Sequence, residues 1–187
     1  MSGRLLESVD RVVKMALEKG ATDAECTAAE GDSFSVTVRM GEIETLTEAG
    51  SKGIGVRVLV GKNTGSAYTS DLSDEGLRAM VNAALGSARV TGEDPFAGLP
   101  ERFGKLEQDL QLFSPDVAEL DAGWKIEQAR RAEKAALDFD PHIQNSEGAS
   151  FDSSLSTNVF GNSRGFLGSY RTSSVSMSVV PVAQNGS

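Results

Sequence analysis

Hydrophobic and polar residues alternate regularly near the end of this chain. Between residues 174 and 179, Val175, Met177 and Val179 are interleaved with serines, and this period of two predicts a β-strand. The surrounding stretch, residues 145–183, is rich in Ser, Gly and Asn. A strand face of small hydroxyl side chains packs closely or binds backbone, so we expect no catalytic group in this segment.

Two other segments repeat their apolar residues at helical spacing. The first covers residues 5–17 and ends before Gly20, where a left-handed conformation is expected. The second follows Ser73, a suitable N-cap, and has Asp74 and Glu75 in its first turn. Its predicted apolar stripe consists of Leu77, Met80, Val81, Ala84, Leu85 and Ala88.

Between these helices the pattern predicts an antiparallel meander of three to five strands. Apolar residues alternate with polar ones in three runs, and glycines mark the turns between them. The expected elements are strands over residues 34–40, 43–48 and 54–60, turns at residues 41–42 and 61–63, and a short strand near Tyr68.

After residue 90 the pattern dissolves into a connector with three prolines, which Phe96, Leu99 and Phe113 should hold against the surface. Ser114, Pro115 and Asp116 predict the start of an Ala-rich helix that runs to about Leu137, with Ser114 as its cap. Four strand-like runs follow, near residues 143–151, 155–160, 166–170 and 175–182.

Together these elements predict an α+β fold, with helices packed on largely antiparallel sheets. We expect a helix–meander–helix domain over residues 1–90, a connector over residues 91–115, and a helix plus strands that begin a truncated second domain over residues 116–187. Both halves read as a helix followed by strands and Gly-containing turns. A duplicated helix-plus-hairpin unit is one interpretation, and chance similarity of element order is the other.

Composition indicates an ordinary soluble protein, and we expect it in the cytoplasm. No apolar run is long enough to cross a bilayer, and Glu7 and Asp10 interrupt any signal-peptide core. The formal net charge of −9 disfavours direct binding to nucleic acid, because that affinity depends chiefly on basic groups that neutralise phosphates. The single cysteine, Cys26, excludes an internal disulfide.

Few residues are candidates for catalysis or metal binding. Cys26 alternates within a strand on the same side as Ala24 and Ala28, which predicts a buried structural thiol. A catalytic pair of Cys26 with His142 is the alternative, although nothing in the sequence brings the two together. One histidine cannot form a two-histidine zinc motif on a helix. We therefore predict no catalytic and no metal-binding residue, and the substrate-binding residues stay unknown.

Two further features suggest sites but have simpler interpretations. The glycine-containing segments at residues 50–55 and 61–64 faintly resemble phosphate loops, but each leads into a strand rather than a helix, so we interpret both as turns. A group of glutamates near the first hairpin could include a hydrolase pair, although a solvated strand face explains them. These glutamates are Glu25, Glu30, Glu42, Glu44 and Glu48.

Five short motifs in the second half of the chain keep a distinctive order and spacing. They are Glu93-Asp94-Pro95-Phe96-Ala97-Gly98-Leu99-Pro100, Asp140-Pro141-His142-Ile143, Asn145-Ser146-Glu147-Gly148-Ala149-Ser150, Asn162-Ser163-Arg164-Gly165-Phe166 and Gly168-Ser169-Tyr170-Arg171. With residues 21–73, they resemble the N-terminal portion of TldD/PmbA family proteins, most closely the PmbA (TldE) branch. Family members are more than twice as long, and their later portion is absent from this sequence.

The resemblance implies a two-subunit metalloprotease complex that processes peptides or unfolded proteins, in a family of proposed DNA gyrase modulators. It implies that zinc belongs to a TldD-type partner, so we expect no cofactor in this chain, which would be the non-catalytic subunit or a fragment of it. The implied partners are that TldD-type protein and a peptide or unfolded substrate, without nucleic acid or membrane. The alternative is a protein-interaction module acting on gyrase or toxin–antitoxin partners without proteolysis.

The resemblance also suggests a use for the serine-bearing strand around residues 174–179. An extended peptide could bind its edge by backbone hydrogen bonds, and packing against a missing domain is the alternative. A sheet edge or apolar face left exposed near the end of the chain should drive self-association into a homo-oligomer.

Overall fold

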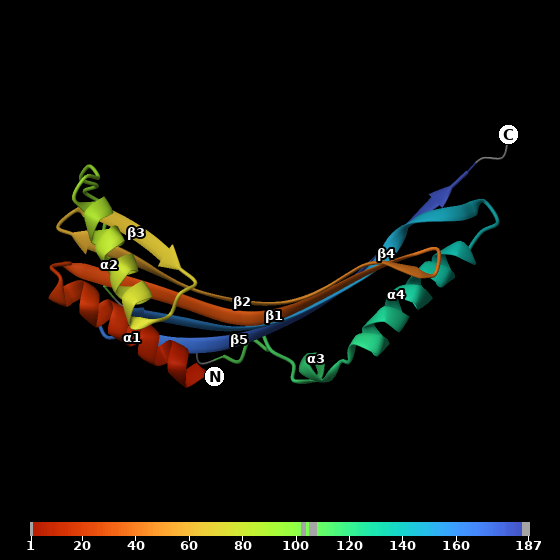
Figure 1. Ribbon diagram of the computed structural model, residues 1–187, viewed down its shortest axis with the longest axis horizontal. Helices are drawn as coiled ribbons and strands as arrows, with labels where there is room; N and C mark the ends of the chain where they lie inside the picture. The colour runs from red at the N-terminus through yellow and green to blue at the C-terminus, as the bar shows by residue number, and fades with distance from the viewer. Residues whose placement is uncertain (1, 102–103, 105–107, 185–187) are drawn as a thin grey trace. The chain divides into compact units, whose positions relative to one another are not determined.

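The computed structural model describes residues 2–101, 104 and 108–184. Its strands form one five-stranded antiparallel sheet in the order β3-β2-β1-β4-β5 (Figure 1), so the fold is α+β, as the sequence predicts. The elements, in chain order, are α1 (Ser2–Glu18), β1 (Asp23–Arg39), β2 (Glu42–Val60), β3 (Asn63–Thr69), α2 (Asp74–Ala88), α3 (Asp116–Glu119), α4 (Ala122–Leu137), β4 (Ile143–Asn162) and β5 (Leu167–Ala183).

The chain divides into two compact units, each assembled from three separate segments. The four long strands β1, β2, β4 and β5 contribute residues to both units. The domain boundaries expected from the sequence follow chain order instead and stay a prediction. Unit 1 comprises Met1–Glu30, Ser51–Leu110 and Thr157–Arg171, and unit 2 comprises Gly31–Gly50, Gln111–Ser156 and Thr172–Ser187.

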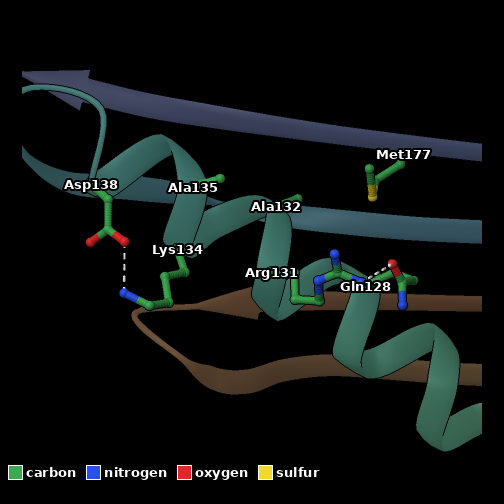
Figure 2. A pocket seen from close by; sticks show the side chains of 7 residues that line it. All are labelled: Gln128, Arg131, Ala132, Lys134, Ala135, Asp138 and Met177. Atoms are coloured by element: carbon green, nitrogen blue, oxygen red, sulfur yellow. Dashed lines mark hydrogen bonds and ion pairs between the residues drawn. The ribbon is translucent and has the colours of Figure 1, made fainter.

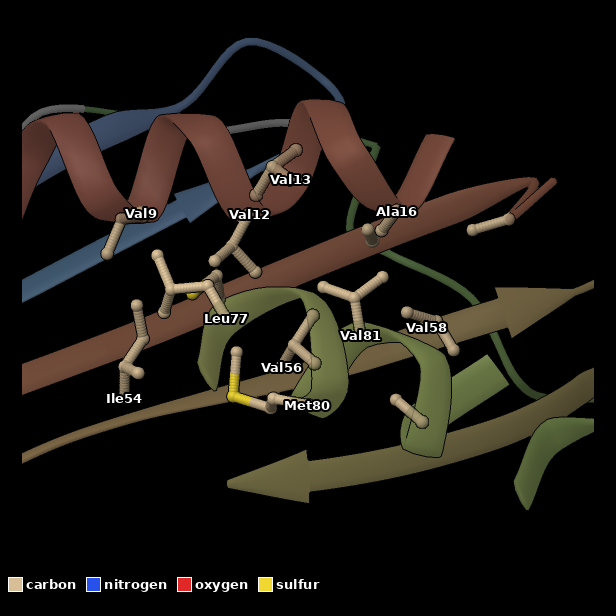
Figure 3. Close-up of a cluster of buried hydrophobic side chains, with 14 of the residues drawn as sticks. Val9, Val12, Val13, Ala16, Ile54, Val56, Val58, Leu77, Met80 and Val81 are labelled. Atoms are coloured by element: carbon tan, nitrogen blue, oxygen red, sulfur yellow. The ribbon is translucent and has the colours of Figure 1, made fainter. Parts of the chain in front are cut away.

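In unit 1, helices α1 and α2 bury their apolar stripes against the sheet (Figure 3). All six predicted stripe residues of α2 are buried, and the α1 stripe is buried or half-buried except at Leu17, which is 38% exposed. Burial of these side chains removes apolar surface from water and is the main stabilising term of the unit. The sheet contributes Ala24, Cys26, Ala28, Ile54, Val56, Val58 and Val159 to this core.

The ends of both helices agree with the sequence predictions. Gly20 has a φ of 101° after α1, and the Ser73 side chain accepts a hydrogen bond of 3.1 Å from the backbone N–H of Gly76 at the start of α2. Helix α2 also lies very close to β3, because a Cβ added to Gly65 would stand 2.1 Å from the Ala84 carbonyl oxygen. Only glycine allows this approach without a backbone shift.

In unit 2, helix α4 packs on the sheet through a smaller core. Phe34, Val36 and Val38 of β1 and Phe151 of β4 meet Ala129 of α4, and all five are buried. Trp124 lies edge-on to Phe151, with ring centroids 5.7 Å apart, and Lys125 stands 4.6 Å above the Phe34 ring. Helix α4 therefore covers β1 and β4 in this unit.

The helix predicted to run from Asp116 to Leu137 is wrong at its start. Residues 116–119 form only the short helix α3, and Leu120 is extended with a ψ of 115°. Helix α4 begins after Asp121, whose side chain accepts a hydrogen bond of 2.9 Å from the Trp124 N–H. The predicted cap Ser114 lies outside α3, and Pro115 occupies the N-cap position. The predicted end at Leu137 is confirmed.

The strands are longer than the sequence pattern predicts. Residues 50–53, interpreted as a turn, lie inside β2, and neither Gly50 nor Gly53 has the positive φ that a glycine turn would use. The four runs expected after residue 143 form two continuous strands, β4 and β5. Turns at residues 40–41 and 61–62 separate β1, β2 and β3, close to where they were predicted.

Of the three residues predicted to anchor the connector after α2, only Leu99 is buried. Leu99 is buried with Ala97 against Leu59 of β2, and Phe113 is half-buried. Phe96 is 93% exposed, so the prediction that it packs against the surface is wrong. The neighbouring Asp94 forms a tight turn, in which its side chain accepts a hydrogen bond from the Phe96 N–H, and this turn directs Phe96 outward.

Candidate functional site

Cys26 is a buried structural thiol, as the sequence predicts. The residue has no exposed surface and lies between the buried Ala24 and Ala28 on β1. Burial raises the pKa of the Cys26 thiol to about 12, because an apolar environment disfavours the thiolate. The thiol is therefore neither accessible nor ionised at neutral pH, and it does not meet the requirements of a nucleophile.

His142 lies on the surface, in a short turn between α4 and β4. Its Nδ1 atom is 2.7 Å from Asp140 Oδ1, and its backbone N–H donates to the same oxygen at 2.8 Å. These two hydrogen bonds lower the pKa of the Asp140 carboxyl below its usual value. The contacts fix a local turn at the exit of α4, and the inaccessible Cys26 cannot complete a catalytic pair with His142.

Of the five glutamates singled out near the first hairpin, Glu25 and Glu44 form ion pairs, and Glu30 is half-buried. Glu25 accepts a hydrogen bond of 2.7 Å from Arg57, and Glu44 lies 3.7 Å from Arg39. Glu42 and Glu48 are exposed. Among residues 2–101, 104 and 108–184, no three His, Cys, Asp or Glu side chains stand close enough to ligate a metal ion.

The most distinctive polar site is centred on Glu133 of α4, which the sequence analysis missed. This residue is 1% exposed, and its carboxylate accepts hydrogen bonds of 2.8 and 2.7 Å from the backbone N–H groups of Met40 and Gly41. The Ser146 hydroxyl of β4 donates a third. Met40 and Gly41 form the tip of the β1–β2 hairpin, so one carboxylate joins α4, this tip and β4.

The electrostatics of Glu133 favour its ionised form. Burial alone would raise its pKa, but the hydrogen bonds from Ser146, Gly41 and Met40, with the charge of Arg39, together lower it below the usual value. Glu133 lies seven residues after Ile126 and four after Ala129, on the buried stripe of α4. A glutamate on an apolar helical stripe is a signal that could have identified this site from the sequence.

An open groove of about 450 Å³ runs between α4 and β5 in unit 2 (Figure 2). Met177 of β5 points toward α4, and Ala132 and Ala135 face it with their methyl groups. The remaining lining side chains are polar and mostly paired with one another, as Lys134 is with Asp138 at 2.7 Å. This composition suits the packing of an apolar side chain rather than acid–base chemistry. The other lining residues are Gln128 and Arg131.

Strand β5 carries the alternating segment from which the sequence analysis began. Its serines Ser174, Ser176 and Ser178 are exposed, and so are Val175 at 45% and Met177 at 56%. The expected exposed edge and apolar face near the end of the chain are therefore confirmed. Binding of a peptide along this strand stays a prediction.

The fold defines a sheet-based α+β protein in which a buried carboxylate, that of Glu133, joins a helix, a hairpin tip and a strand. Two family models match it, one after the other. The PmbA/TldA metallopeptidase domain 1 covers residues 24–88, and the PmbA/TldA metallopeptidase central domain covers residues 115–187. The chain belongs to the PmbA/TldD family.

Curated relatives agree with this assignment. The chain is 38% identical over 181 residues to the metalloprotease PmbA of Escherichia coli O157:H7, covering 94% of this chain and 40% of that protein. It is 37% identical over 180 residues to a metalloprotease PmbA homologue of Haemophilus influenzae, covering 93% of this chain and 38% of that protein. The chain thus spans about two fifths of the length of these relatives.

Solved structures share the fold at lower sequence identity. A protein named as a modulator of DNA gyrase from Bacteroides thetaiotaomicron superposes with a TM-score of 0.86 at 22% identity, covering 97% of this chain and 41% of that one. TldE from Thermococcus kodakarensis superposes with a TM-score of 0.79 at 18% identity, covering 96% of this chain and 40% of that one. These likenesses extend over both compact units and show the fold.

Proposed function

We propose that this chain forms the N-terminal portion of a non-catalytic, PmbA-type subunit in a two-subunit cytoplasmic metalloprotease that processes peptides or unfolded proteins. The succession of the two PmbA/TldA domain models along the chain carries the proposal. Identities of 37% and 38% to two PmbA proteins support it. Because the chain spans about two fifths of those relatives, the activity is proposed for the assembled complex.

The resemblance to the PmbA branch supports a non-catalytic role, because in that branch the zinc is expected in a TldD-type partner. Within this chain the buried Cys26 is inaccessible as a nucleophile. We therefore assign the zinc to the partner and no bond-breaking step to this chain. The contribution of the chain is a surface for assembly or for substrate, on the exposed parts of the two units.

Reconstitution tests this proposal. The 187-residue chain would be mixed with a zinc-loaded TldD-type protein, and cleavage of a fluorogenic peptide would be followed for each protein alone and for the mixture. We expect cleavage to rise only in the mixture and to disappear when a chelator removes zinc. A Cys26→Ser variant should support cleavage equally well, because the thiol takes no part. Turnover by the purified chain alone would contradict a non-catalytic role.

The alternative is a protein-interaction module that acts on gyrase or on toxin–antitoxin proteins without proteolysis. The exposed Phe96 favours it, because hydrogen bonds hold the surrounding loop while the ring stays in water. Lys62 anchors this loop, since its carbonyl oxygen accepts from Asp94 N–H at 3.0 Å and its Nζ donates to the Ala97 carbonyl at 2.8 Å. Preorganised aromatic side chains are common anchors at protein interfaces. Partner binding that depends on Phe96, without any gain in cleavage, would favour this alternative.

A further inference from the structure

The outer edge of β5 in unit 2 has little of the usual protection of a sheet edge. Strand β5 is the last strand in the sheet order, so one of its two sides faces away from β4. From Thr172 to Ala183 the strand carries no charged side chain. Exposed edges of natural sheets are usually protected by charged residues or by a covering segment, because they otherwise pair with another strand.

Two hydrogen bonds show which residues of β5 direct their backbone groups outward. The Ser173 N–H donates at 2.9 Å to the carbonyl oxygen of Leu112, which lies outside the sheet, whereas the Gln184 N–H donates at 2.9 Å to His142, next to β4. Backbone groups in a strand alternate between its two sides. Residues 175, 177 and 179 therefore face outward like Ser173.

Both ends of this free edge are blocked. At one end the segment around Leu112 covers Ser173, and the Ser114 N–H also donates to the Ser173 hydroxyl at 2.8 Å. At the other end Pro181 has no N–H to offer, as is usual for proline on an edge strand. In the part of the chain that the structure describes, the outward N–H and C=O groups of Val175, Met177 and Val179 have no strand beside them.

The free segment is a palindrome: Val175-Ser176-Met177-Ser178-Val179 reads the same in both directions. We propose that it binds the same segment of a second copy of this chain, antiparallel, about a twofold axis at Met177. In this register Met177 opposes Met177 of the partner subunit, and Val175 opposes Val179 of the partner subunit. Each outward N–H then meets an outward carbonyl of the other copy.

Self-complementarity is the reason for choosing a second copy over an unrelated peptide. A twofold contact uses the same surface on both partners, and a palindromic strand places like side chains opposite each other on both faces. Within the palindrome Val175 and Val179 share a face with Met177, which lines the groove beside α4 (Figure 2), and Ser176 and Ser178 lie on the opposite face. This pairing is independent of the proposed protease role.

The first test is the oligomeric state of the whole chain, measured by sedimentation velocity over a range of protein concentrations. The measurement is made at about 0.15 M ionic strength, where a Debye length of about 8 Å screens the net negative charge of each copy. We expect a monomer–dimer equilibrium whose dissociation constant rises at least about tenfold in Met177→Lys, since two lysines would then face each other across the axis. Met177→Leu should still dimerise, and so should Ala83→Lys, which adds the same charge on the exposed face of α2.

The second test checks the register by disulfide cross-linking, since the native Cys26 is buried. Paired residues of an antiparallel ladder have Cα atoms about 5.5 Å apart, so Met177→Cys should cross-link rapidly to its own copy under mild oxidation. Ser174→Cys should not, because it opposes Val180 of the partner subunit and lies about 20 Å from Ser174 of that subunit. Equal cross-linking of both variants, a chain that stays monomeric at high concentration, or an edge that pairs only with an added peptide or TldD-type protein would overturn the proposal.

Discussion

Single residues determine how unit 2 holds its hairpin tip in place. The tip residue Met40 has a φ of 50° and Gly41 a φ of 82°, so both lie in the left-handed region, and both N–H groups reach one carboxylate. Glu133 accepts hydrogen bonds from both. A buried carboxylate is costly unless hydrogen bonds replace its water, and here three donors do so.

We expect Glu133→Gln to lower the free energy of unfolding by about 1–3 kcal/mol. The amide has no charge, and its NH₂ group would face one of the two backbone N–H groups that the carboxylate now accepts from. Glu127→Gln, on the exposed side of the same helix, is the matched control and should change stability little. Chemical denaturation followed by the fluorescence of Trp124, the one tryptophan, measures both variants. Equal stability of the two variants would contradict an anchoring role for Glu133.

The same carboxylate predicts a pH dependence. Its folded-state pKa is lowered, so its contribution to stability is fully present above the unfolded-state pKa of about 4.3 and is lost as the pH falls through the lower folded-state value. The stability difference between the native protein and Glu133→Gln should therefore shrink below about pH 4. A difference that stayed constant down to acid pH would exclude an ionised Glu133.

At the scale of elements, helix α4 shows how a local cap decides where a helix begins. Ser114 and Pro115 form an acceptable start signal, but Leu120 is extended and interrupts the helix after one turn. Asp121 then caps a new helix of 16 residues. The main helix of unit 2 thus depends on a carboxylate that the sequence pattern did not single out.

Asp121→Ala should destabilise the chain by about 1 kcal/mol, because the Trp124 N–H loses its acceptor at the helix N-terminus. Ser114→Ala removes the cap predicted from the sequence and should have a much smaller effect, while Asp121→Asn should retain most of the stability. Thermal unfolding followed by circular dichroism compares the three. A larger loss in Ser114→Ala than in Asp121→Ala would show that the helix starts where the sequence pattern placed it.

At the scale of the whole molecule, the net charge indicates which kinds of partner the surface can bind. The formal net charge is −9, and several of the basic side chains are already paired with carboxylates, as Arg57 is with Glu25 and Arg11 is with Asp74. Among the described helices, none is long and apolar enough to span a bilayer. An acidic surface repels phosphate groups, so it suits protein partners better than phosphate-rich partners such as nucleic acid.

We expect no binding to duplex DNA at physiological ionic strength, because a net charge of −9 leaves no excess of cations to neutralise the phosphates and release their counterions. Fluorescence anisotropy with a labelled duplex measures this, and a basic DNA-binding protein serves as the positive control. An affinity that falls steeply with rising salt would contradict the expectation and would favour a direct action on nucleic acid.

Much of the fold follows from local pattern. The stripes of α1 and α2, the caps at Gly20 and Ser73, the burial of Cys26 and the α+β class all depend on residues close together in sequence, so periodicity and turn chemistry predict them. Local pattern does not predict that the separate strand-like runs join into the long strands β2, β4 and β5. Gly50 and Gly53 favour a turn locally, but pairing with neighbouring strands keeps them extended within β2.

The sequence by itself determined the helix faces, the hairpin turns, the likeness to the PmbA/TldD family and the serine–apolar alternation of β5. Only the tertiary structure showed that Glu133 holds a hairpin tip, that Phe96 faces solvent, and that β5 lies at the edge of the sheet with Val175, Met177 and Val179 directed outward. The physical reason is the range of the interactions. Periodicity records which face of an element is apolar, whereas burial of a charge and exposure of a strand edge depend on which distant elements lie beside it.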